Sequence, residues 1–113
     1  MPKPDPEAKR AFEALVAFAP GATVKPMFGN FAAFKGGLMF AGVFGDQVFV
    51  RLSEADRQAA MDQLRVKLFE PMKGRPMKEY VCLPAAVLAD TKMSRAWVAK
   101  SLKYVGTLPP KKA

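Results

Sequence analysis

Three cations in one short segment are the first residues whose types and spacing could do chemistry. The sequence KGRPMK places Lys73, Arg75 and Lys78 around Gly74 and Pro76. A glycine lets the backbone approach a ligand closely, and an arginine can hold a carboxylate or phosphate through paired hydrogen bonds. The segment lacks the Gly-Lys-Ser/Thr order of a phosphate-binding loop and leads into a strand instead of a helix. Two interpretations stay open: an anion site, or a surface hairpin whose proline sets the entry into the next strand.

A second group of cations lies on one side of a predicted helix near the C-terminus. Residues 91–113 carry six cations and no acid, in a chain of net charge +8. At helical spacing four of them, Lys92, Arg95, Lys100 and Lys103, share one arc, opposite an apolar side that includes Met93 and Trp97. This pattern predicts either a face for an acidic partner or an ordinary solvated face. The candidate interaction surface combines both groups: Lys73, Arg75, Lys78, Lys92, Arg95, Lys100 and Lys103.

The composition is unfavourable for common kinds of catalysis. The chain has no histidine, which removes the commonest general base and the commonest zinc ligand. Its single cysteine, Cys82, excludes an intrachain disulfide, and no carboxylate spacing is typical of a metal site. We expect no catalytic residues, no cofactor and no metal, and we interpret Cys82 as a small buried side chain. An enzyme would need a pocket holding Glu79, Tyr80 or Cys82 with a strongly shifted pKa.

Hydrophobic periodicity and capping residues predict the elements that position these side chains. In the last predicted strand, Tyr80 and Cys82 face one side while Val81 and Leu83 face the other. The expected elements are a helix capped by Asp5 and ended by Pro20-Gly21, strands within 23–37, strands at 38–44 and 47–52 joined by Gly45-Asp46, a helix capped by Ser53, extended segments at 67–72 and 78–84, a short helical turn after Pro84, and a helix from Asp90 or Thr91 to Gly106. The expected core residues are Phe28, Phe31, Phe34, Phe40, Phe44, Phe49 and Trp97.

This order of elements predicts an α+β fold with two layers, in which an antiparallel sheet of about five strands has helices packed on one face. We expect one domain over residues 5–108, a disordered N-terminus at 1–4 and a basic tail at 109–113. No apolar run approaches the roughly 18 residues that a membrane helix needs. The first ten residues do not resemble a signal peptide. We therefore expect no membrane partner and a cytoplasmic protein.

Several segments in a fixed order resemble the N-terminal domain of the TfoX/Sxy family. They are MFG at 27–29, MFAGVFGDQVFVRLSEADR at 39–57, FEPMKGRPMKEYVCLP at 69–84 and the helix around Trp97, so the resemblance covers roughly residues 10–108. It implies a two-layer α/β fold with an antiparallel sheet, like that of secretion-chaperone-type domains. Two-domain members carry a further helical domain after this one. Many stand-alone relatives have cysteines just after MFG, where this chain reads NFAAF.

The resemblance also implies a function, because the best-known members of the family regulate natural competence. It implies a non-enzymatic regulatory or protein-interaction module that assists transcription regulation. The expected partner is a protein, such as the cyclic-AMP receptor protein that family members use, and the chain is expected to be a monomer or a homodimer. The charge favours an alternative function, which is direct non-specific binding of nucleic acid through the basic C-terminal helix.

Overall fold

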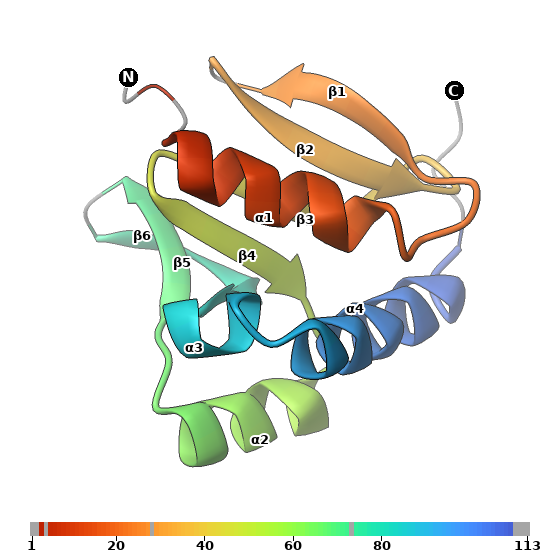
Figure 1. Cartoon of the computed structure of the whole chain (residues 1–113). Helices are drawn as coiled ribbons and strands as arrows, with labels where there is room; N and C mark the ends of the chain where they lie inside the picture. The colour runs from red at the N-terminus through yellow and green to blue at the C-terminus, as the bar shows by residue number, and fades with distance from the viewer. Residues whose placement is uncertain (1–2, 4, 28, 73, 110–113) are drawn as a thin grey trace.

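The structure is a computed structural model that describes residues 3, 5–27, 29–72 and 74–109. Within them, four helices and six strands form two layers (Figure 1). In chain order these are α1 (Pro6–Val16), β1 (Thr23–Met27), β2 (Asn30–Lys35), β3 (Leu38–Phe44), β4 (Gln47–Arg51), α2 (Glu54–Leu64), β5 (Leu68–Met72), β6 (Arg75–Leu83), α3 (Ala85–Leu88) and α4 (Thr91–Gly106).

The strands form one antiparallel sheet in the order β1-β2-β3-β4-β6-β5. This confirms the predicted α+β fold, although the sheet has six strands where about five were expected. The difference arises at the end of the sheet. Residues 68–83 fold into a hairpin, and its second arm begins at Arg75 and not at Lys78. The part of the KGRPMK segment from Gly74 to Lys78 therefore belongs to the turn and the second strand of a hairpin.

The main core lies between the sheet and the helices. Val43, Val48 and Val50 are fully buried on the helix side of β3 and β4, and each of the four described helices adds a buried side chain to them. A β-bulge brings Phe40 into this core. Ala33 pairs with Ala41 and the next pair skips Phe40, so that Phe40 joins the cluster beneath the helices.

A smaller cluster covers the other face of the sheet. The fully buried rings of Phe49 and Phe69 stack 3.9 Å apart, and Tyr80 packs edge-on against Phe49. Gly42 lies opposite Phe49 on β3, and a side chain there would overlap the ring. A glycine is therefore needed for the close approach of this strand to the Phe49 ring. Cys82 is half-buried beside this cluster, which confirms the predicted alternation.

Helix caps confirm most of the predicted boundaries. The side chains of Asp5, Ser53 and Asp90 accept hydrogen bonds from the first turns of α1, α2 and α4. The end of the first helix is an exception, because α1 stops at Val16 and not at Pro20-Gly21. The amides of residues 18 and 19 bond carbonyls three residues back, which tightens the chain into a turn before the apolar periodicity ends.

The predicted disorder of residues 1–4 and the basic tail at 109–113 fall mostly outside the described residues. In the described part of the chain, none of the helices has the length and apolar character needed to cross a membrane.

Candidate functional site

The basic face of α4, defined by Lys92, Arg95, Lys100 and Lys103, is exposed along its whole length. The opposite side of the helix is fixed to the rest of the fold by two buried serines. The Ser94 hydroxyl donates to the Val87 carbonyl at 2.7 Å, and the Ser101 hydroxyl donates to the Phe40 carbonyl at 2.8 Å. These bonds and the buried Trp97 hold the helix so that its cations face solvent.

Two of these cations have partners within the molecule. Arg95 lies 5.2 Å from the ring centre of Phe18. The Lys100 ammonium is 3.8 Å from Asp56 and 5.7 Å from the ring centre of Trp97.

The other two cations are less engaged. Lys92 and Lys103 form no ion pair or ring contact with any residue that the structure describes. They are eleven positions apart, close to three helical turns, so they lie along one line of the helix. The basic face therefore keeps positive charge that no described acid neutralises. Met93 differs from expectation, since it was placed on the apolar side and its side chain is 38% exposed.

Two of the other predicted cations, Arg75 and Lys78, lie on β6 in the β5–β6 hairpin. Lys73 lies outside the described residues, the side chain of Arg75 is likewise not described, and Lys78 is exposed on β6. Gly74 has a φ of 80°, a left-handed conformation that favours glycine, and its amide donates to the Glu70 carboxylate. Figure 1 shows this hairpin at the left of the molecule and α4 at the lower right. The structure thus divides the predicted surface into two parts.

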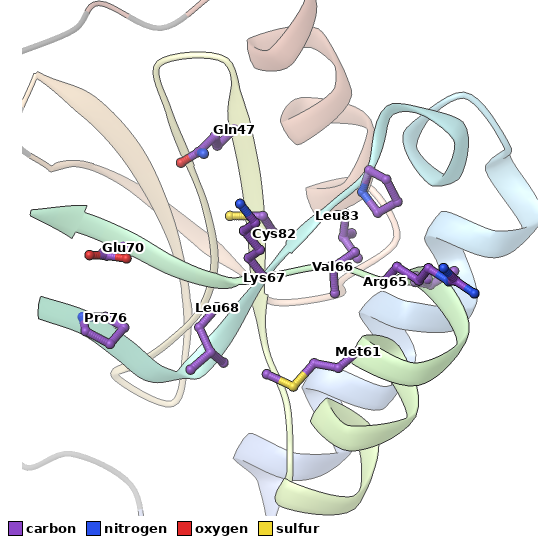
Figure 2. Close-up of a pocket in the computed structure, with 12 residues that line it drawn as sticks. Gln47, Met61, Arg65, Val66, Lys67, Leu68, Glu70, Pro76, Cys82 and Leu83 are labelled. Atoms are coloured by element: carbon purple, nitrogen blue, oxygen red, sulfur yellow. The ribbon is translucent and has the colours of Figure 1, made fainter. Parts of the chain in front are cut away.

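A groove that the sequence analysis missed lies between α2, β5 and β6, with a volume of about 770 Å³ (Figure 2). It flanks the connector, residues 65–67, which joins α2 to β5. Its lining residues are Gln47, Met61, Leu64, Arg65, Val66, Lys67, Leu68, Glu70, Pro76, Cys82, Leu83 and Pro84. All but Gln47 lie within residues 61–84, but they belong to a helix end, a connector and two strands and share no motif, so no periodicity or spacing could have revealed them.

The thiol of Cys82 lines this groove but is poorly suited to nucleophilic chemistry. Burial, with a smaller effect from the charge of Asp46, raises the pKa of the Cys82 thiol to about 11. A nucleophilic cysteine needs a lowered pKa, because the thiolate is the reactive form. Cys82 is therefore protonated at neutral pH, in agreement with its interpretation as a packing residue.

A cluster of polar side chains joins β4, β6 and α4. The Tyr104 hydroxyl donates to one oxygen of the Glu79 carboxylate at 2.7 Å, and the Arg51 side chain donates to the other at 2.7 Å. The hydrogen bond from Tyr104 is the largest cause that holds the pKa of Glu79 below its ordinary value, and Arg51 acts in the same direction. A carboxylate that is ionised and already accepts two hydrogen bonds is a poor general base. This cluster therefore favours a structural role.

Tyr80 is likewise held in a structural arrangement. Burial raises the pKa of its phenol, and its hydroxyl donates to the Met39 carbonyl at 3.2 Å. The pKa values of Glu79, Tyr80 and Cys82, the candidates for an enzyme, are therefore all shifted in the direction that makes the side chain less reactive. Among the described residues, no group of three or more acidic or cysteine side chains is placed to hold a metal ion.

A family model described as the TfoX N-terminal domain matches residues 5–105 of this 113-residue chain. No curated protein matches the chain. The matched family is not one known for an enzymatic reaction.

Proposed function

The chain belongs to the TfoX N-terminal domain family, and we propose that it is a non-enzymatic regulatory module that binds a protein partner through the basic face of α4. The proposed role is an accessory one in transcription regulation of the competence type, carried out in the cytoplasm. The observation that carries this proposal is the exposed pair Lys92 and Lys103, whose charges have no described counterion. A partner would therefore present an acidic surface, and a transcription regulator such as the cyclic-AMP receptor protein is the first to test.

The chemistry of the remaining polar residues supports binding over catalysis. Cys82 is held as a thiol and Glu79 is held by two hydrogen bonds, so neither is poised to transfer protons or attack a substrate. The attachment of α4 by Ser94 and Ser101 supports recognition, because the backbone of a fixed helix loses little freedom when it meets a partner.

The test measures binding of the chain to the purified cyclic-AMP receptor protein of the same organism, by calorimetry at physiological salt. A Lys92→Gln/Lys103→Gln variant removes the two unpaired charges without touching a described contact. We expect this variant to bind about thirtyfold more weakly or worse, because each of two close interfacial charge pairs contributes on the order of 1 kcal/mol or more. The control variant Lys3→Gln/Arg10→Gln removes the same charge from exposed positions outside the basic face and should bind as the unaltered chain does.

A titration of labelled duplex DNA with the chain, at low and at physiological salt, tests the alternative function. Affinity for DNA alone that persists at physiological salt, and falls in the Lys92→Gln/Lys103→Gln variant, would replace the proposal with direct non-specific nucleic-acid binding. A chain that binds neither the regulator nor DNA, or whose binding ignores both lysines, would overturn the role assigned to the basic face.

A further inference from the structure

We propose that the groove beside the connector is a second docking site, which binds a segment of a partner protein that carries acidic residues next to a large apolar side chain. This site is separate from the basic face of α4, and nothing in the family match assigns it. The inference rests on the floor of the groove, on the charges at its rim and on the backbone conformation of one rim residue.

The floor of the groove is largely apolar. Half-buried side chains from three consecutive parts of the chain form it: Met61 on α2, Val66 on the connector and Leu68 on β5. Figure 2 shows these three side chains around the hollow. Its volume of about 770 Å³ could receive one or two large apolar side chains. Removing such side chains from water would supply affinity that is not specific for charge.

The charges at the rim favour an acidic ligand. Arg65 and Lys67 are exposed at the groove and form no ion pair with any described residue. The acid at the rim, Glu70, is already engaged, because its carboxylate accepts the Gly74 amide in the hairpin turn. Two cations against one acid leave the lining of the groove with a net positive charge. This charge complements a carboxylate placed next to the apolar floor.

The backbone at Arg65 gives an independent indication that this cation has a role. Arg65 ends α2 in the left-handed conformation, with φ 54° and ψ 39°, and it is the one described residue other than glycine with a positive φ. Glycine is the usual residue at such a helix end, because a Cβ atom is disfavoured there. Residues kept in a disfavoured conformation gather at binding sites. Here the conformation occurs at an exposed cation that is one of the residues lining the groove.

The location of the groove favours an extended peptide segment over a compact ligand. The groove follows β5, which is the last strand of the sheet and pairs on one side only, with β6. An extended segment lying in this groove presents side chains at alternate positions, so an apolar side chain and its acidic neighbours can contact different parts of the lining. One apolar side chain could then enter the hollow while acidic neighbours reach Arg65 and Lys67.

The experiment uses fluorescein-labelled octapeptides in which glutamate alternates with leucine and phenylalanine, and matched peptides with glutamine in place of glutamate. Anisotropy is measured with the full chain and with an Arg65→Asn/Lys67→Gln variant. Asparagine tolerates the left-handed conformation, so this variant removes charge and keeps the helix end. We expect the chain to bind the glutamate peptides, and the variant to bind them about tenfold more weakly.

The control is again Lys3→Gln/Arg10→Gln, which loses the same charge away from the groove and should retain full affinity. Circular dichroism verifies that each variant is folded. No detectable binding of the glutamate peptides, or equal binding by the Arg65→Asn/Lys67→Gln variant, would overturn the proposal. Equal binding of the glutamine peptides would overturn it as well, because the groove would then select apolar side chains alone. None of these results depends on Lys92 or Lys103, so the two docking proposals can fail separately.

Discussion

At the scale of single residues, Gly42 is the position where a small change has the largest predictable effect. Its partner across the sheet is Phe49, and a Cβ atom would overlap the Phe49 ring, which is stacked on Phe69. We expect Gly42→Ala to lower the free energy of unfolding by about 1–3 kcal/mol, because the stacked rings leave no room to move. Urea denaturation measures this difference.

The matched control is Gly106→Ala at the end of α4, where a Cβ atom meets nothing within 4 Å. Alanine is the better helix former, so this change should be neutral or stabilise the fold by up to about 1 kcal/mol. If Gly42→Ala were as well tolerated as Gly106→Ala, the packing described for the smaller cluster would be wrong.

The carboxylate of Glu79 predicts a dependence of stability on pH. Its pKa in the folded protein is below the ordinary value of 4.5. Its bonds to Tyr104 and Arg51 therefore stabilise the fold fully above that pH, and the contribution is lost as the pH falls through the lowered pKa. Glu79→Gln should cost about 1 kcal/mol or less at neutral pH, because the pair is partly exposed. The difference from the unaltered chain should shrink toward about pH 3, measured by thermal unfolding across the pH range. A difference that grew on acidification would contradict the assigned direction of the pKa shift.

At the scale of elements, Arg65 connects helix geometry with the proposed docking site. If its conformation is disfavoured, Arg65→Gly should raise the free energy of unfolding by about 0.5–1 kcal/mol, since glycine adopts positive φ without a steric penalty. Denaturant titration of the two proteins tests this. Peptide binding to the groove should fall in the same variant, so that stability and binding change in opposite directions. A variant that is less stable than the unaltered chain would remove the argument from backbone conformation.

Local signals in the sequence were enough to predict most elements. The helix caps depend on residues close together in the sequence, so they were predicted at Asp5, Ser53 and Asp90. The alternation along β6, which separates Tyr80 and Cys82 from Val81, was predicted for the same reason. The misplaced boundaries have a physical reason. Apolar spacing continues to Ala19, which is buried, although the backbone has already left the helix at Val16.

The polar cluster and the groove could not be predicted because their residues meet only through the tertiary fold. Arg51 and Glu79 are 28 positions apart, and Tyr104 lies a further 25 positions along the chain. No single-sequence periodicity relates such positions. The cations of α4 were predicted because one regular helix places them all, whereas their separation from the β5–β6 hairpin needed the arrangement of the whole sheet.

At the scale of the whole molecule, both edges of the sheet carry a proline. Pro26 lies in β1 and Pro71 in β5, and these are the two outer strands. A proline cannot donate a backbone hydrogen bond, so it weakens pairing of an edge with another chain. β1 needs this protection more, because nearly all of it is exposed and Val24 is 45% exposed. Association through β1 is therefore opposed, which agrees with the proposal that partners bind at the basic face and at the groove.

This arrangement predicts that the chain is a monomer and that Pro26 prevents its association through β1. The unaltered chain should sediment at its own mass of 12.4 kDa across a wide range of concentrations. Pro26→Thr restores a backbone donor and adds a residue that favours strands, so it should give dimers or larger species as concentration rises. Pro109→Thr, outside the sheet, is the matched control and should remain monomeric. Sedimentation equilibrium distinguishes the cases. A stable dimer of the unaltered chain, or a Pro26→Thr variant that stays monomeric at every concentration, would show that the proline does not control this edge.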